Sequence, residues 1–77
     1  MPTYYRFEHE KPRNGEKLTC FKTLQALKIS VTASQLRNAD ADFSNMKFWK
    51  VEGTFVKEED NEVLVRINSA MQIKTAL

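Results

Sequence analysis

One short segment of the chain has the periodicity of a helix, and it constrains the fold more than any other feature. Thr23 is a residue that can cap a helix, and Leu24, Leu27 and Val31 follow at the i, i+3 and i+7 spacing of one helical face. A further turn is expected to carry Leu36 inward as well. The remaining apolar segments favour strands, so this helix is expected to pack across a sheet.

Two strands are expected before the helix, joined as a hairpin. Residues 3–7 and 17–21 contain aromatic and β-branched residues that are typical of strands. Between them, Asn14 and Gly15 form a dipeptide that supplies the positive φ angles of a tight turn.

Four apolar segments follow the helix, and each is predicted as a strand or a short strand arm: residues 46–51, 54–56, 63–65 and 71–73. Gly53 is expected to break the first of these strands. The polar step from Asn68 to Ser69 is expected to form the turn into the last strand. Alternation along that strand then directs Met71 and Ile73 into the core.

This order of elements predicts an α+β fold. It favours a ubiquitin-like β-grasp, in which a mixed four- to five-stranded sheet carries one main helix on one face and leaves the other face open. At 77 residues the chain is expected to be a single domain, 1–77, near the lower limit for burying a useful core. Met1 indicates a genuine start, so we expect the N-terminal module of a longer protein, with residues 75–77 as a disordered tail.

Catalysis and metal binding are disfavoured by the residues that would have to supply them. His9 has no second histidine beside it, and the lone Cys20 is expected to be a small core residue rather than a nucleophile. Asp40 and Asp42 offer too few oxygens for calcium, and the two glycines form no phosphate-binding loop. We therefore expect no enzyme activity and no cofactor, in a reducing, intracellular compartment.

A small single-stranded RNA-binding domain is the alternative to a protein-binding one. Lys47, Trp49 and Lys50 lie close together, and Tyr4 with Arg6 is expected across the sheet from them. Aromatic rings interleaved with cations can stack bases and hold phosphates. The net charge of only +2 argues against nucleic acid, and strand alternation requires Trp49 or its neighbour to face the core.

Four segments of the chain resemble the DWNN domain, the ubiquitin-like module that heads the retinoblastoma-binding ubiquitin ligases of pre-mRNA 3′-end processing. In the order and spacing of that family, they are "YYRF" (4–7), "TLQALKISV" (23–31), "QLRNADADF" (35–43) and "NSAMQIK" (68–74). The chain departs from the family at its end. Arg66 and Ile67 stand where the family has proline and lysine, and Thr75 stands where it has a second arginine.

The resemblance implies a non-catalytic docking domain of a nuclear E3 ubiquitin ligase, which binds the endonuclease subunit of the cleavage and polyadenylation machinery. In that family an acidic residue and basic residues of the last strand contribute to the contact, and they correspond to Asp40 and Lys74. The open sheet face is expected to add Trp49, Arg6 and Arg66 as an apolar patch with a charged rim. These five are the predicted partner-binding residues of a monomer.

Overall fold

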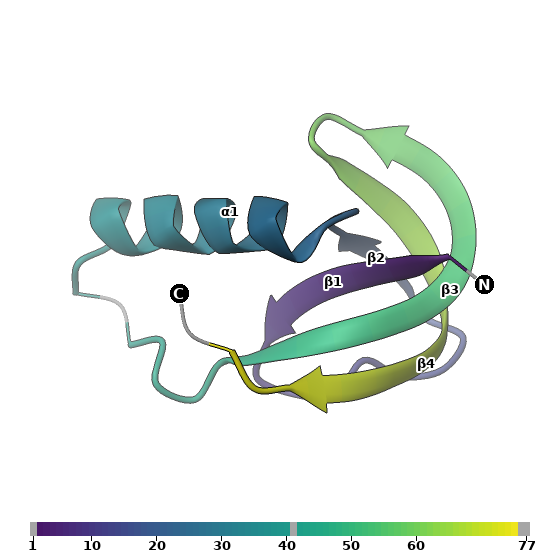
Figure 1. Cartoon of the computed structure of the whole chain (residues 1–77), viewed down its shortest axis with the longest axis horizontal. Coiled ribbons are helices and arrows are strands. Elements are labelled where there is room, and N and C mark those ends of the chain that lie inside the picture. The colour runs from purple at the N-terminus through teal and green to yellow at the C-terminus, as the bar shows by residue number, and fades with distance from the viewer. Residues whose placement is uncertain (1, 41, 76–77) are drawn as a thin grey trace.

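The computed structural model describes residues 2–40 and 42–75. It has an α+β fold, in which one helix packs on a curled four-stranded antiparallel sheet (Figure 1). The expected disordered tail falls on residues 75–77, of which 76 and 77 lie outside the described residues. In chain order the elements are β1 (Thr3–Glu8), β2 (Lys17–Cys20), α1 (Leu24–Arg37), β3 (Lys47–Glu59) and β4 (Glu62–Ile73).

The strand pairing differs from the pairing expected from the sequence. The strand order is β1-β3-β4-β2, and every neighbouring pair is antiparallel. The predicted mixed sheet is therefore wrong. Of the predicted N-terminal hairpin only one antiparallel bridge is present, between Tyr5 and Phe21, because β1 pairs along its length with β3 and β2 with β4. Gly15 does adopt a positive φ of 89°, but its turn carries the chain toward β4. There the Gly15 N–H donates to the carbonyl of Ile67 at 2.7 Å.

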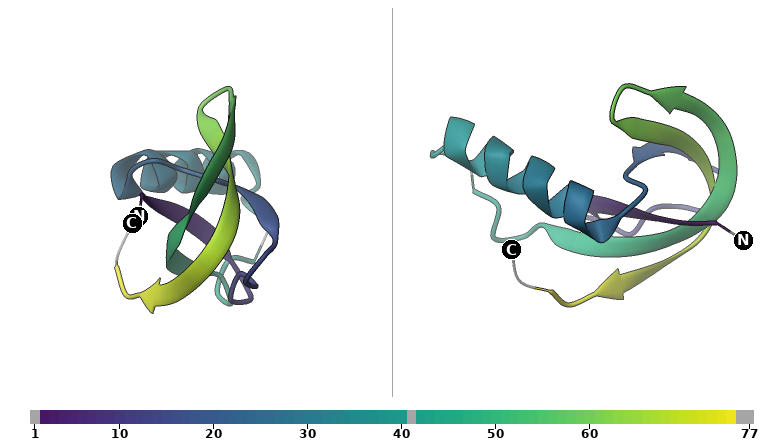
Figure 2. Two further views of the ribbon diagram at one scale, coloured as in Figure 1. Left: turned by 90° about the vertical axis from the view of Figure 1, so that its right-hand side faces the viewer. Right: turned by 45° about the horizontal axis from the view of Figure 1, so that its top comes forward.

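The two outer strands of the sheet meet each other, so the sheet curls on itself. Tyr5 of β1 and Phe21, just after β2, form an antiparallel bridge. Figure 2 shows the resulting curl, with β3 and β4 bending together around one end of the molecule. The face of the sheet that was expected to be open is consequently turned inward.

β3 and β4 are each one continuous strand, although the sequence predicted breaks in both. Gly53 lies inside β3 next to a register shift, and a Cβ built on it would lie 2.4 Å from Cγ1 of Val65 and 2.5 Å from the carbonyl oxygen of Arg66. Glycine is needed there for close approach of the two strands, not for ending one of them. Asn68 and Ser69 likewise lie within β4, so the predicted turn is wrong.

The helix covers one face of the sheet and curling encloses the other, so the domain has two cores. Phe48 and Trp49 are successive residues of β3, and both are buried because strand alternation sends them to different cores. The core inside the curl contains Tyr4, Cys20, Trp49, Val51, Val63, Val65 and Ile67. The core under α1 contains Leu27, Val31 and Phe48, with Tyr5, Phe7, Phe21, Leu24 and Ile73 packed against it.

The predicted start and inner face of the helix are confirmed, and its predicted end is not. The side chain of Thr23 accepts a hydrogen bond from the Ala26 N–H at 3.1 Å, and the leucine and valine side chains predicted to face the sheet do so. Leu36 is 81% exposed, so its predicted inward position is wrong. Met71 is also exposed, so its predicted inward position is wrong, whereas Ile73 packs against the cluster under α1. Met71 pairs with Lys50, which is exposed as well, so this row of the sheet lies beyond that cluster.

Candidate protein-interaction site

Arg6 is one of the predicted partner-binding residues, and the structure uses its side chain within the fold. It is half-buried, forms an ion pair with Glu8, and donates from Nη1 to the carbonyl of Thr19 at 2.6 Å. The side chain therefore links β1 to the end of β2, on the same seam as the Tyr5 bridge. The guanidinium is thus engaged within the fold, and the predicted contact of Arg6 with a partner stays a prediction.

Trp49 is the second predicted contact residue that the structure places inside the protein. It is 6% exposed, and its indole Nε1 donates to the carbonyl of Glu8 at 3.1 Å. The register does align Arg6, Trp49 and Gln72 in one row across three strands. That row lies on the side of the sheet turned into the curl, so Trp49 is a core residue and the exposed position expected for it is wrong.

Asp40, Lys74 and Arg66 are exposed, and they occupy two separate places. Ile73 pairs with Phe48 near the start of β3, and Lys74 follows Ile73 directly. The end of β4 therefore lies at the same end of the molecule as the loop between α1 and β3, which contains Asp40 (Figure 1). Arg66 is eight residues earlier, and its register partner in β3 is in the bent part of that strand. The five predicted residues thus do not form one surface.

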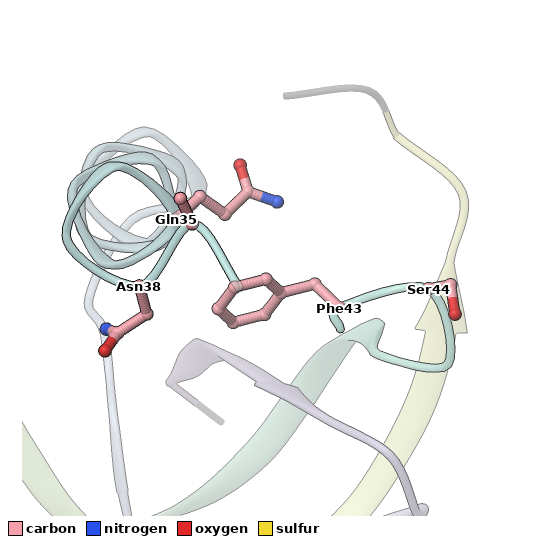
Figure 3. A pocket seen from close by; sticks show the side chains of 5 residues that line it. Gln35, Asn38, Phe43 and Ser44 are labelled. Atoms are coloured by element: carbon pink, nitrogen blue, oxygen red, sulfur yellow. The ribbon is translucent and has the colours of Figure 1, made fainter. Parts of the chain in front are cut away.

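A hollow of about 440 Å³ lies where α1 ends, with Ala39, the residue before Asp40, in its lining. Figure 3 shows the ring of Phe43 turned toward the last turn of the helix, next to Gln35 and Asn38. Ser44 completes the lining and donates its backbone N–H to Asp42 at 2.9 Å. Hydrogen bonds from the Ser44 side chain and from its backbone N–H hold the pKa of the Asp42 carboxyl below its usual value.

The outer face of α1 carries a second apolar row, called here the outer stripe: Ala26, Ile29, Ala33 and Leu36. Spacings of three, four and three residues place these side chains on one side of the helix, because each residue turns it by about 100°. Leu27, which faces the sheet, lies on the opposite side. Ile29 is 64% exposed and Leu36 is 81% exposed. A helix that is apolar on both sides is typical of one that is covered on both sides.

The turn between β3 and β4 forms a wall beside the outer stripe. A groove of about 640 Å³ separates Ile29 and Ala33 on the helix from Asp60 and Glu62 on the hairpin, with Phe21 also in its lining. The groove therefore has one apolar side and one acidic side. Among the ion pairs of the described residues, none involves Asp60 or Glu62.

A salt bridge holds this hairpin near the start of the helix. Lys22, which precedes the helix cap, donates from Nζ to the carboxylate of Glu58 at 2.7 Å. The hydrogen bond and the charge of Glu58 raise the pKa of the Lys22 amine, although both groups are exposed to solvent. Both side chains are more than half exposed, so the contact adds little to the stability of the fold.

The groups considered for catalysis are separate from this site. Cys20 is buried, and burial raises the pKa of its thiol to about 11, so the thiolate is scarce at neutral pH. His9 is exposed in the loop after β1. In the described part of the chain no three metal-binding side chains gather, and no helix is long and apolar enough to span a membrane.

The sequence contains a signal for the outer stripe that the helix assignment did not use. Ala26, Ile29, Ala33 and Leu36 have the same kind of spacing as the inner face, and they are visible in the printed sequence. Comparisons of the chain with models of protein families, with curated proteins and with solved structures find no match.

Proposed function

We propose that the chain is a non-catalytic protein-interaction module that docks its partner on the outer stripe of α1. One observation carries this proposal: Ile29 and Leu36 expose most of their side-chain surface on a helix whose other side is already packed on the sheet. Burying apolar surface of this kind is the main source of affinity in protein association. The alternation of large and small side chains along the stripe also suits a packed helix better than a flat surface.

A photo-crosslinking experiment tests this proposal. A benzophenone side chain replaces Leu36 in the chain as it is expressed in cells, and a second variant carries it in place of Met71. Met71 is a matched control because it is a large apolar residue with 64% exposure that lies on β4, away from α1. We expect protein adducts from position 36 and few from position 71. Equal yields at the two positions, or no adduct at position 36, would contradict the proposal.

The more specific proposal is that the domain is the ubiquitin-like head of an E3 ubiquitin ligase of pre-mRNA cleavage and polyadenylation, acting in the nucleus. The four segments that resemble the DWNN family support it, as does a single helix packed on a curled sheet. The pairing of β1 with β3 is the point at which the sheet departs from the N-terminal hairpin expected from the sequence. Asp40 and Lys74 remain exposed, and the segments that contain them, the loop after α1 and the end of the chain after β4, lie toward the same end of the molecule (Figure 1).

Charge reversal tests the endonuclease subunit as the partner. Asp40→Lys and Lys74→Glu should each weaken binding of the purified subunit several-fold, because exposed charges at an interface orient the partners. Arg66→Glu is the control, since Arg66 is exposed at a different place on β4. If the unaltered domain does not bind the subunit, this partner is excluded. That result would not affect the outer stripe, which the crosslinking experiment tests separately.

Single-stranded RNA remains the second prediction, and no feature of the fold favours it. Its surface required the rings of Tyr4 and Trp49, which are 7% and 6% exposed. Arg6, the cation expected beside them, is engaged by Glu8 and Thr19. Stacking on bases needs exposed rings, so this surface would have to unfold before it could bind.

A further inference from the structure

The outer stripe has the pattern of a short coiled-coil seam. Spacings of three, four and three residues put Ala26 and Ala33 at the a positions of two heptads, and Ile29 and Leu36 at the d positions. A strict seam of this width accommodates one helix lying along it, in contrast to the broader apolar face of a helix that packs on a sheet. The occupant of the stripe is therefore expected to be a helix.

We propose that this helix is α1 of a second copy of the chain, packed antiparallel about a two-fold axis near Val31. The inference rests on the proposed function of the outer stripe and names its partner. In an antiparallel pair, each a position of one helix faces a d position of the other helix. Ala33 of one copy then faces Ile29 of the second copy, and Ala26 faces Leu36. Every layer combines one small and one large side chain, so four similar layers fill the contact.

A parallel pair would pack the same residues much less evenly. Alanine would face alanine in two layers, and Ile29 and Leu36 would each face their own copies in the other two. The two helix axes can keep only one distance along this short contact. At that distance the two alanine layers would leave space empty and the two layers of large side chains would be too crowded. The antiparallel pair has the further advantage that it opposes the dipoles of the two helices.

The charges beside the stripe are complementary in the same antiparallel arrangement. Asp60 and Glu62 flank the stripe on the side where Ala26 and Ser30 lie. Arg37, in the last turn of α1, lies on this same flank by the rotation of 100° per residue. A two-fold axis perpendicular to the helices brings equal flanks together, so Arg37 of the second copy approaches the acidic hairpin of the first. The contact occurs twice, once on each side of the axis.

The size of the contact predicts a weak dimer. α1 has 14 residues, which corresponds to a length of about 21 Å. One helix pair of that length buries less than the roughly 800 Å² per partner of a standard stable interface. We therefore expect dimers to become abundant only at concentrations of about 10 μM to 1 mM, a range typical of transient association.

Sedimentation velocity over that concentration range tests the proposal. We expect the mass to rise from monomer to dimer, and we expect Ile29→Glu and Leu36→Glu to weaken the dimer at least about tenfold. Met71→Glu is the control, since Met71 and Ile29 are both 64% exposed. All three side chains are exposed in the monomer, so the melting temperature at low concentration should change little and loss of the dimer cannot be attributed to unfolding.

Charge reversal tests the antiparallel direction. Arg37→Glu should weaken the dimer because it places like charges beside the hairpin of the other copy. Adding Asp60→Lys and Glu62→Lys to the same chain should restore it, because Arg37 approaches this hairpin only when the helices are antiparallel. A dimer that Arg37→Glu weakens and the triple variant does not restore would overturn this arrangement.

The outcomes separate this inference from the proposed function. A chain that stays monomeric up to about 1 mM would overturn the second copy as occupant. A dimer that tolerates Ile29→Glu and Leu36→Glu would overturn it too, by placing self-association elsewhere. In either case crosslinking at position 36 to a different protein would still support the outer stripe as a docking site. A crosslinked product of twice the mass of the chain supports both.

Discussion

Tyr5 and Phe21 exchange both of their backbone hydrogen bonds, each 2.8 Å long, and this pair joins the two outer strands of the sheet. The junction turns one face of the sheet into a core, with Trp49 inside it. It thereby removes the open sheet face on which partner binding was predicted. The outside of the molecule remains for a partner, and there the outer stripe of α1 exposes Ile29 and Leu36.

Arg6 closes the same seam with its side chain, so its replacement should destabilise the fold. Arg6→Met keeps most of the apolar stem but removes the hydrogen bond to the Thr19 carbonyl and the ion pair with Glu8. We expect the free energy of unfolding, measured with urea, to fall by about 1–3 kcal/mol. Arg66→Met should change it by less than about 0.5 kcal/mol, because Arg66 is exposed. Equal effects of the two changes would argue against a structural role for Arg6.

Gly53 and Gly15 should respond very differently to alanine. Gly53→Ala forces a methyl group to within 2.4 Å of the Val65 side chain and 2.5 Å of the Arg66 carbonyl oxygen, so the β3–β4 pair must shift. We expect a loss of more than about 3 kcal/mol of unfolding free energy. Gly15→Ala meets no atom within 4 Å and should lose about 1–2 kcal/mol, from its positive φ alone. Thermal unfolding of both variants compares them, and a milder effect at Gly53 would contradict the tight strand crossing.

The Cys20 thiol should make stability depend on alkaline pH. Burial raises its pKa from 9.0 to about 11, so the folded chain holds this proton more tightly than the unfolded chain does. The stabilisation is complete below pH 9 and is lost as pH rises toward 11, by up to about 2–3 kcal/mol. Because lysines and tyrosines also titrate in this range, the comparison is with Cys20→Ala. That variant should lose less stability between these pH values, and parallel curves would refute the assignment.

Trp49 is the one tryptophan of the chain, so its fluorescence reports directly on the core. Its emission should be that of a buried indole and should shift to longer wavelength on unfolding. Trp49→Phe should reduce stability by about 0.5–1.5 kcal/mol, since the hydrogen bond to the Glu8 carbonyl is lost while an aromatic ring remains. Single-stranded RNA should leave the emission unchanged. Quenching by RNA at low salt would instead support an exposed stacking surface.

The sequence predicted the elements better than their pairing. Thr23 as cap and Leu27 and Val31 as inner face depend on residues a few positions apart, and all three were correct. Strand pairing depends on contacts between distant segments. An Asn-Gly turn favours a tight hairpin, but here Gly15 binds Ile67, more than 50 residues later. Nothing in the local sequence of β1 specifies β3 as its neighbour.

The errors at the candidate site have the same physical origin. Arg6 was expected across the sheet from Trp49, and the register does pair the two. The sheet face that they share was expected to be open, and it is closed because curling of the sheet is not a local property. Leu36 was taken to face inward although its spacing from Ile29 places both on the outer side of α1. The outer stripe was thus accessible from the sequence, whereas the acidic hairpin beside it required the fold.

Chemical-shift mapping tests the central claim, that the outer stripe is the docking surface, most directly. The isotope-labelled chain is observed at low concentration, at increasing concentration, and with any protein captured by crosslinking at position 36. We predict that the largest amide shifts occur at Ile29, Ala33 and Leu36, with smaller ones at Asp60 and Glu62 across the groove. Binding that shifts other surfaces and leaves these residues unchanged would contradict the account.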